Sequence, residues 1–187
     1  MRQRLWFLLA VAVPVLLADQ VGKALVVERS PVSVGTLLQR TAESPGDERM
    51  LIDGVLGVRL QPNPQLQAGA VGLLPAKLVG PLLHGAGLLA LVFLVWFALS
   101  QGDLSRRLQA GLAALIGGAA GNLLDRLIHG AVLDWLQWHG PGGASASFTL
   151  GDVGIWSGVG VLVLELVRPR DARLTGPATA PPALPGV

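Results

Sequence analysis

The stretch that decides the fold is Gly117–Gln137, GGAAGNLLDRLIHGAVLDWLQ. Its beginning continues an apolar helix, because leucine and isoleucine recur at helical spacing from Leu108 onward. Asn122, Asp125 and Arg126 then follow at i, i+3 and i+4, which places the three polar side chains on one helix face. Polar groups at membrane depth are costly, so a cluster of this kind in an apolar helix indicates a functional site.

Three glycines, Gly117, Gly118 and Gly121, lie one turn before this cluster. Glycine has no Cβ, so another backbone or a ligand can approach the helix closely there. Asp134 follows at the point where the helix should end. A simpler interpretation is an Asp–Arg pair at a helix terminus with an exposed loop carboxylate, but it does not explain why the cluster interrupts so hydrophobic a chain.

Composition favours an integral membrane protein with one domain. The chain has 187 residues, of which 51% are hydrophobic and 14% charged, and its mean hydropathy is +0.57. Soluble chains carry about 25% charged residues. Cysteine is absent, which excludes disulfides, thiolate nucleophiles and thiolate metal sites. The formal charge of +2 comes from basic residues near the ends of apolar runs, a pattern that sets membrane orientation and gives little support to nucleic-acid binding.

The hydrophobic pattern predicts a mainly α membrane protein with four transmembrane helices. Their expected ranges are 5–27, 81–99, 108–129 and 148–167, each near the roughly 20 residues that span a bilayer. The apolar run from Leu5 to Ala18 would also fit a cleaved signal peptide. However, the helical pattern continues through Asp19 and Lys23, which are spaced at i, i+4 and can pair. We therefore favour an uncleaved first span.

The segments outside these spans are expected to be small. Glu28–Val79 is polar and broken by proline and glycine, and we expect short strands within Met50–Leu60, with Gly54 and Gly57 as bends. Gly130–Ser147 is expected to be a loop. Residues 169–187 are rich in Pro, Ala, Gly and Thr and are expected to form a disordered cytoplasmic tail, which leaves a membrane domain of residues 1–168.

Basic residues predict the orientation. Four spans bring the clusters at positions 2–4, 106–107 and 168–173 to one side, and the positive-inside rule places that side, with both termini, in the cytoplasm. The ionisable and amide groups of the spans then gather at the outer end: Asp19, Lys23, Asn122, Asp125, Arg126, Asp134 and Asp152.

Two of these carboxylates, those of Asp134 and Asp152, suggest general acid–base catalysis. Asp152, in FTLGDVGI, lies just inside an apolar helix, where it needs a partner or a proton. Asp134 leaves the preceding helix at the same membrane face. Two neighbouring carboxylates hold one proton between them, so one can take a proton from water while the other donates to a carbonyl oxygen. His129 and His139 lack a carboxylate spacing typical of metal ligands, so no metal or other cofactor is expected.

At this point four motifs, read in chain order, carry a resemblance to a known family. They are Asp19-x-x-x-Lys23, GGAAGNLLDR at 117–126, VLDW at 132–135 and FTLGD at 148–152. In this order they resemble the lipoprotein signal peptidase family, signal peptidase II. The resemblance covers most of residues 1–167, and the GGxxGNxxDR block is its most specific part.

The resemblance implies an intramembrane aspartic endopeptidase of the bacterial cytoplasmic membrane, with its active site at the outer face. Its substrates would be diacylglyceryl-modified prolipoproteins, with membrane lipid as a further partner and a monomer as the expected state. By position, Asp134 and Asp152 match the catalytic dyad of the family. The matching supporting or substrate-binding positions are Asp19, Lys23, Asn122, Asp125 and Arg126. The family also carries a β-cradle and a periplasmic helix, which Glu28–Val79 would form.

Two departures from the family pattern stand out. Thr149 replaces the usual asparagine of FNxAD, and Gly151 replaces its alanine. A hydroxyl cannot offer the donor pair and carbonyl of an amide, so altered substrate contacts are expected. The N-x-G-A segment of the family is at best QAGA, with Gln67 in place of asparagine, or is displaced to Asn63.

Two other functions compete with a peptidase. A catalytically silent relative that binds lipidated peptides or a membrane partner would share every apolar feature, and only turnover separates it from an enzyme. A transporter could use Asp19, Asp134 and Asp152 as a proton relay. The lack of an internal repeat disfavours a transporter, since many transporters consist of repeated halves.

Overall fold

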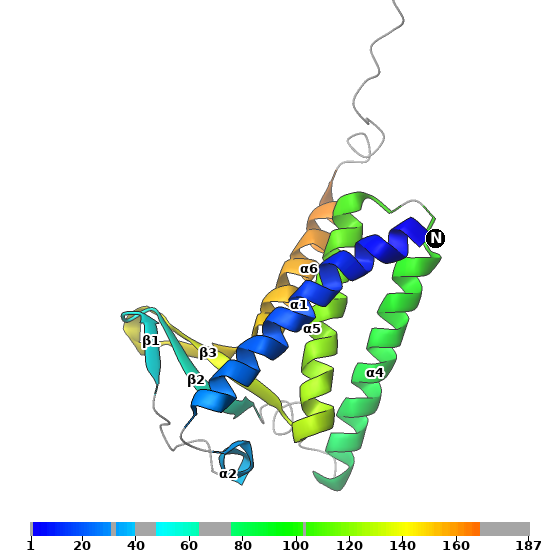
Figure 1. Cartoon of the computed structure of the whole chain (residues 1–187). Helices are drawn as coiled ribbons and strands as arrows, with labels where there is room; N and C mark the ends of the chain where they lie inside the picture. The colour runs from blue at the N-terminus through cyan, green and yellow to red at the C-terminus, as the bar shows by residue number, and fades with distance from the viewer. Residues whose placement is uncertain (1, 31–32, 40–47, 64–75, 103, 169–187) are drawn as a thin grey trace, which may run out of the picture.

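The computed structural model describes residues 2–30, 33–39, 48–63, 76–102 and 104–168. Figure 1 shows a bundle of long helices with a small sheet at one end. The long helices are α1 (Arg2–Arg29), α4 (Ala76–Ser100), α5 (Arg106–His129) and α6 (Leu150–Val167). A short helix, α2 (Val34–Gln39), follows α1. The strands are β1 (Arg49–Ile52), β2 (Leu56–Asn63), β3 (Val132–His139) and β4 (Ser145–Phe148).

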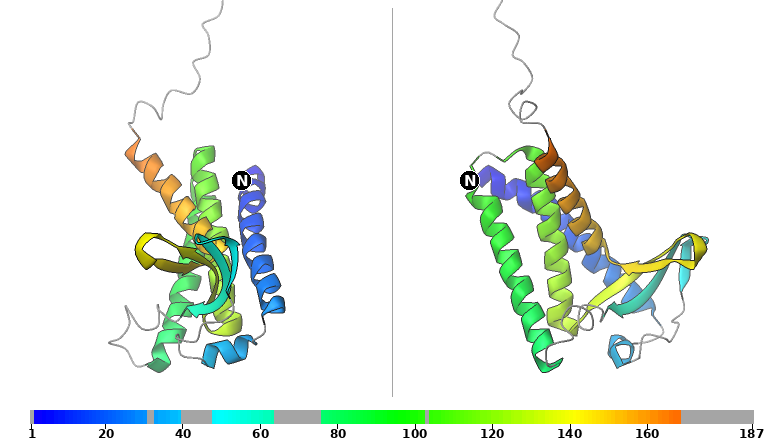
Figure 2. Two further views of the ribbon diagram at one scale, coloured as in Figure 1. Left: turned by 90° about the vertical axis from the view of Figure 1, so that its left-hand side faces the viewer. Right: turned by 180° about the vertical axis from the view of Figure 1, so that it is seen from behind.

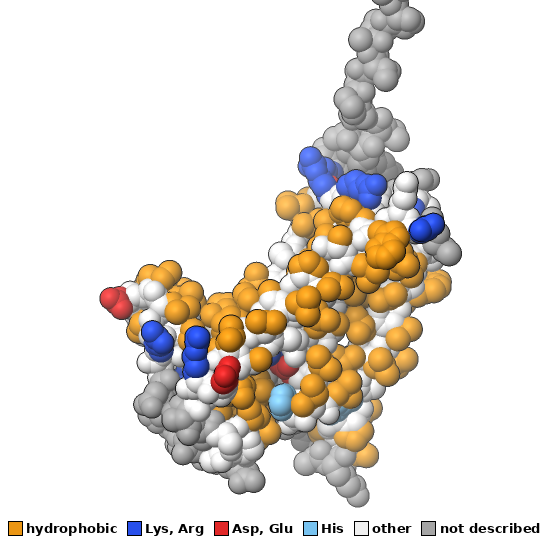
Figure 3. Space-filling view, viewed as in Figure 1, with side chains coloured by type: hydrophobic (Ala, Val, Ile, Leu, Met, Phe, Trp, Pro, Cys, Tyr) orange, Lys and Arg blue, Asp and Glu red, His pale blue; other side chains and the backbone are white. Residues whose placement is uncertain are grey.

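Within the described residues, four helices are long and apolar enough to cross a membrane, namely α1, α4, α5 and α6. This confirms the predicted mainly α membrane fold. The last span was predicted to start at Phe148, which is wrong: Phe148 ends β4, and Thr149 caps a helix that begins at Leu150. Apolar side chains cover the outside of the bundle (Figure 3); for example, Leu89 is 71% and Trp156 73% exposed. Such a surface suits contact with lipid.

Helix α5 is the centre of the bundle and contacts α1, α4 and α6. Its glycines allow the close approach that the sequence predicts. A Cβ on Gly117 would collide with the backbone of Ala12 in α1, and one on Gly118 would collide with the carbonyl oxygen of Gly151 in α6. Small residues at helix interfaces of membrane proteins permit this backbone-to-backbone packing. The start of α6 is thereby held directly against α5.

The sheet is antiparallel, with strand order β1-β2-β3-β4. Its two halves come from different segments, because β1 and β2 precede α4 whereas β3 and β4 follow α5. The prediction of a loop over Gly130–Ser147 is therefore wrong. This segment becomes β3 and β4 because β2 offers a pairing edge, with Gln61 opposite Asp134 and Asn63 opposite Val132. A partner strand so distant in sequence leaves no local signal.

The strands expected within Met50–Leu60 are confirmed, although Gly57 lies inside β2 rather than at a bend. Gly54 makes the turn, with a φ of 67° that glycine adopts readily. The polar segment is shorter than expected, since α1 continues to Arg29 and α4 begins at Ala76. The expectations for Gln67 and for the tail at 169–187 fall outside the described residues.

The two ends of the bundle differ in character. The sheet projects sideways from one end, as Figures 1 and 2 show from several directions. The N-terminus and the last described residues of α6 lie at the other end. Lys and Arg side chains gather at this second end in Figure 3, while those near the sheet lie beside Asp and Glu side chains. The bundle thus has a basic end and, opposite it, an end that carries the sheet.

Candidate active site

Asp152 is fixed at the first turn of α6 by its own helix cap. The backbone N–H of Thr149 donates to Asp152 Oδ2 (2.8 Å), and the Asp152 N–H donates to Thr149 Oγ1 (3.0 Å). This reciprocal pair is a capping box. Asn122 of α5 donates from Nδ2 to Asp152 Oδ1 (2.7 Å). Both oxygens of the carboxyl group therefore accept hydrogen bonds, an arrangement that suits an ionised carboxylate.

Asp134 lies in the middle of the sheet rather than in a loop. Its side chain is 1% exposed, and its Oδ2 accepts a hydrogen bond from Asn63 Nδ2 of β2 (2.7 Å). Its Oδ1 is buried and has no hydrogen-bond partner within the described residues. A buried carboxyl oxygen without a partner is costly when the group is ionised.

The electrostatic surroundings of Asp134 follow from this position. Burial raises its pKa from 3.8 to about 7, and the negative charges of Asp152 and Asp125 act in the same direction. The hydrogen bond from Asn63 and the charge of Lys23 oppose the shift. Asp134 can therefore hold a proton near neutral pH, and the negative charge of Asp152 favours this protonated state.

Lys23, Asp19 and Asp125 form a buried ion triad. Lys23 is 4% exposed and forms ion pairs with Asp19 Oδ2, one helical turn earlier in α1, and with Asp125 Oδ2 of α5 (2.7 Å). Gln20 donates to Asp125 Oδ1 (3.0 Å). The predicted pairing of Asp19 with Lys23 is present, and Lys23 is shared with a second carboxylate. A lone buried charge would be far less stable than this compensated cluster.

The triad also holds the backbone beside each aspartate of the pair. Asp19 Oδ1 accepts a hydrogen bond from the N–H of Gly151 (3.0 Å). Asp125 Oδ2 accepts one from the N–H of Leu133 (3.1 Å). Gly151 directly precedes Asp152, and Leu133 directly precedes Asp134. The triad is therefore a positioning device for both candidate catalytic residues.

Arg126 does not pair with its neighbour Asp125. Its Nη1 donates to the carbonyl oxygen of Asn122 (3.1 Å), and its own carbonyl oxygen contacts His84 Nε2 (2.8 Å). The simpler interpretation of an Asp–Arg pair with an exposed loop carboxylate is thus wrong, because Asp125 binds Lys23 and Asp134 is buried.

Some residues of the site had little sequence signal. Asn63 was considered only as a displaced form of a family motif, and its contact with Asp134 depends on strand pairing. Gln20 was not predicted, although a glutamine inside an apolar helix, next to Asp19, is itself a signal of a buried contact. His84 of α4 was not predicted either.

No group of three or more potential ligands that could hold a metal ion is present within the described residues. Among the described residues, neither His129 nor His139 forms a hydrogen bond or an ion pair with Asp134 or Asp152. His139 Nε2 pairs with Glu48 Oε1 (2.5 Å) on the sheet, and His129 is the last residue of α5.

The fold and the buried cluster define a multi-pass membrane protein with a pair of carboxyl groups held where a helical bundle meets a small sheet. The sequence pattern of the family described as Signal peptidase (SPase) II matches residues 11–168. The chain belongs to this family, which is a family of aspartic peptidases.

Individual relatives are similar over part of their length. The lipoprotein signal peptidases of Brucella ovis and Brucella canis are 38% identical to this chain over 90 residues, which are 44% of this chain. The match spans about half the length of these relatives (55%).

Solved structures support the fold. One structure of a bacterial membrane enzyme superposes with a TM-score of 0.65 at 24% identity, covering 85% of this chain and 86% of the other. A second bacterial membrane enzyme gives a TM-score of 0.63 at 22% identity, covering 86% and 92%.

Proposed function

We propose that this protein is an aspartic endopeptidase that removes signal peptides from diacylglyceryl-modified prolipoproteins. The observation that carries the proposal is the state of Asp134, whose pKa is raised to about 7 by burial and by the charge of Asp152, among other groups. An aspartic peptidase needs one carboxyl group that is protonated beside one that is ionised. Membership of the signal peptidase II family supports the choice of substrate class.

The surroundings of the two aspartates favour different roles. Asp152 accepts hydrogen bonds at both oxygens, from Asn122 and Thr149, so we assign it the ionised state and the role of general base toward water. Asp134 keeps one buried oxygen without a partner within the described residues, so we assign it the proton. It would donate this proton to the carbonyl oxygen of the scissile peptide bond. The C–N bond of the resulting gem-diol then breaks as Asp152 passes its proton to the leaving amine. One hydroxyl of the gem-diol returns a proton to Asp134 as the product carboxyl group forms, so both aspartates regain their starting states.

A lipid-modified substrate needs apolar surface on which its acyl chains can dock. A groove of about 860 Å³ lies between the end of α1, α2 and the sheet; Trp135 is part of its wall, whereas neither Asp134 nor Asp152 lines it. Apolar side chains such as Leu25 and Leu60 line it. We propose that this groove contributes to docking of the substrate in the membrane.

The proposed location is the bacterial cytoplasmic membrane, with both termini in the cytoplasm and the aspartates at the outer face. The basic end of the bundle supports this orientation. Cysteines introduced as Asp53→Cys, in the exposed turn between β1 and β2, and as Ser105→Cys, at the start of α5, test it in this cysteine-free chain. An impermeant reagent added to intact cells should label the first and not the second. The opposite labelling pattern would reverse the orientation.

The direct test of function is turnover. Purified protein in detergent is incubated with a diacylglyceryl-modified prolipoprotein and, in parallel, with the same chain lacking the lipid. We expect cleavage immediately before the modified cysteine of the lipidated substrate only. Binding of the lipidated substrate without cleavage would identify a silent relative instead.

A further inference from the structure

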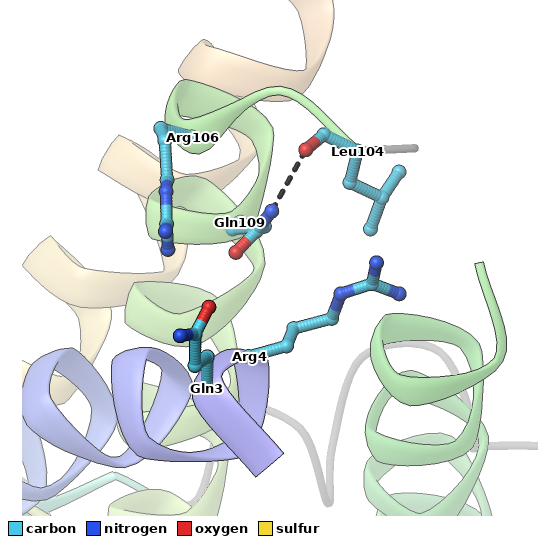
Figure 4. A pocket seen from close by; sticks show the side chains of 5 residues that line it. All are labelled: Gln3, Arg4, Leu104, Arg106 and Gln109. Carbon is cyan, nitrogen blue, oxygen red and sulfur yellow. Dashed lines mark hydrogen bonds between the residues drawn. The ribbon is translucent and has the colours of Figure 1, made fainter. Parts of the chain in front are cut away.

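A polar pocket, separate from the apolar groove described above, lies at the basic end of the bundle, far along the helices from the two aspartates. It has a volume of about 220 Å³ and is lined by side chains of α1, of α5 and of the residues just before α5 (Figure 4). The lining residues are Gln3, Arg4, Leu104, Arg106 and Gln109. Neither the proposed peptidase chemistry nor its positioning residues use this pocket.

Gln109 supplies a buried hydrogen-bond acceptor. Its side chain is only 7% exposed, and its Nε2 donates to the carbonyl oxygen of Leu104 (2.7 Å). Its Oε1 is buried and accepts no hydrogen bond within the described residues. In Figure 4 this oxygen turns away from Leu104 toward Gln3 and the pocket. Leaving a buried amide oxygen unpaired is unfavourable, so a ligand that donates a hydrogen bond here would remove that penalty.

Two arginines give the pocket a positive potential. The guanidinium of Arg106 is held over the ring of Phe7, 4.9 Å from its centroid, and Arg4 donates to the carbonyl oxygen of Gly102. Figure 4 shows their side chains on opposite sides of the Gln109 amide. Arg106 is also the first residue of α5, where the helix dipole is positive. In the described part of the chain, no carboxylate pairs with either guanidinium.

We propose that this pocket binds the headgroup of an anionic phospholipid that carries both a phosphate and a free hydroxyl, as phosphatidylglycerol does. The phosphate would lie against the arginines, and the hydroxyl would donate to Gln109 Oε1. A membrane lipid fits the position, because the neighbouring side chains of α1 are apolar and exposed; Leu5 is 42% and Trp6 63% exposed. The proposal does not depend on the peptidase function.

Headgroup chemistry separates this proposal from simple charge attraction. Phosphatidylmethanol carries the same net charge as phosphatidylglycerol but no headgroup hydroxyl, so it cannot donate a hydrogen bond to Gln109. Free glycerol phosphate carries both groups but no acyl chains, so it distinguishes a membrane lipid from a soluble ligand. We therefore expect phosphatidylglycerol to bind most tightly of the three.

The test is native mass spectrometry of the full chain in detergent, titrated with each of these three probes. Arg106→Gln should weaken phosphatidylglycerol binding about fivefold or more. Arg107→Gln is the matched control, because Arg107 is also exposed and basic but does not line the pocket; it should change binding less than twofold. Gln109→Met, which keeps the length of the side chain and removes the acceptor, should abolish the preference for phosphatidylglycerol over phosphatidylmethanol.

Three outcomes would overturn the proposal. Equal weakening by Arg106→Gln and Arg107→Gln would mean general charge attraction. Equal affinity of the wild type for phosphatidylglycerol and phosphatidylmethanol would remove the role of Gln109. Binding of glycerol phosphate as tight as that of the lipid would mean a site for a soluble ligand. Arg106→Gln alters an exposed side chain, so its result does not depend on Gln109→Met folding.

Discussion

The backbone N–H of Gly151 donates a hydrogen bond to Asp19 Oδ1 across the α1–α6 interface (3.0 Å). Gly151 immediately precedes Asp152, so a residue of the first helix holds the backbone at the start of the last one. Asp125 does the same for Leu133, immediately before Asp134. Lys23 neutralises both Asp19 and Asp125. The geometry of the proposed catalytic pair therefore depends on a single buried ammonium group.

Replacing this ammonium group should destabilise the whole protein. Lys23→Met leaves Asp19 and Asp125 buried without a compensating charge, and breaking a buried ion pair typically costs about 3–5 kcal/mol. Thermal unfolding in detergent should show a large drop in Tm. Arg29→Met, at the exposed end of the same helix, is the control and should change stability by less than about 0.5 kcal/mol. Similar Tm values for both variants would mean that the triad does not stabilise the fold.

Each aspartate of the proposed pair should be essential for turnover. Asp134→Asn and Asp152→Asn each remove a proton donor or acceptor, so cleavage of lipidated substrate should fall by at least about 10²-fold. Expression and membrane insertion should be unchanged. Asp53→Asn, in the exposed turn between β1 and β2, should cleave normally. Near-normal turnover by either of the first two variants would rule out the assigned pair.

The pH dependence of turnover should report on Asp134. Its pKa is raised to about 7, and the proposed role requires its protonated form. The rate should therefore be insensitive to this group below pH 7 and fall about tenfold per pH unit above it. A profile of kcat/KM against pH measures this alkaline limb. A rate that instead rises through pH 7 would mean that Asp134 acts as the ionised partner.

Substitution of Asn63 should shift the pH at which kcat/KM begins to fall. The hydrogen bond from Asn63 lowers the pKa of Asp134 against the effect of burial. Asn63→Leu removes this bond, so the alkaline limb should shift to higher pH, whatever happens to the absolute rate. Ser145→Ala, at an exposed position of β4, is the control, and its profile should keep the wild-type limb.

Stability should follow the same titration. A carboxyl group whose pKa is raised on folding stabilises the folded state fully below its ordinary pKa of 3.8, and this contribution is lost as pH rises through about 7. The Tm of the wild type should therefore decline between pH 4 and 8 by more than that of Asp134→Asn, which carries no titrating group there. Parallel Tm curves for the two proteins would contradict the raised pKa.

The helical part of the fold could be predicted from the sequence because its signals are local. Each span is a continuous apolar run, and glycines such as Gly117 and Gly118 mark the close contacts of α5 with its neighbours. The spacing of Asn122 and Asp125 on α5 correctly identified two side chains that turn toward other helices. Helical periodicity therefore carried most of the information.

The sheet could be predicted only in part. The hairpin of β1 and β2 has a local turn at Gly54, whereas β3 and β4 exist because β2, some 70 residues earlier, pairs with Val132–His139. The position of Asp134 in a strand and its contact with Asn63 depend on this non-local pairing. The division of roles that we propose for Asp134 and Asp152 depends in turn on burial, which no spacing in the sequence encodes.

The glycines of α5 offer a test of the packing. Gly118→Ala would place a Cβ against the carbonyl oxygen of Gly151, where neither backbone can yield easily, so we expect loss of stability and of activity. Gly85→Ala, in α4, is the matched control, because no atom of the described residues lies within 4 Å of the added Cβ. It should be neutral or stabilise by up to about 1 kcal/mol, since alanine favours the helix. Thermal unfolding and cleavage assays measure both effects.

Thr149 and Gly151 are the residues at which the site departs from the family pattern. Thr149 is fully buried, caps α6 and contacts Asn122 Oδ1 (3.3 Å) as well as Asp152. A Cβ on Gly151 would lie 3.0 Å from Asn122 Oδ1 and 3.1 Å from Thr149 Oγ1. The two departures therefore share one small space beside Asp152. Substitutions at these positions should be non-additive, as is usual for side chains in contact.

Thr149→Asn should retain the helix cap, because asparagine caps helices at least as well as threonine, and it restores an amide beside Asp152. One neutral hydrogen bond changes rate or affinity by roughly threefold to tenfold, so activity toward standard lipobox substrates should rise by that much. Gly151→Ala alone should lower activity by crowding Asn122 and Thr149. In the Thr149→Asn background the cost should differ, and a double-mutant cycle of kcat/KM measures the coupling. A wild type that is silent on every lipidated substrate, yet cleaves as Thr149→Asn, would identify the native chain as a non-cleaving relative whose catalytic pair is intact but whose substrate contact has been lost at this one residue.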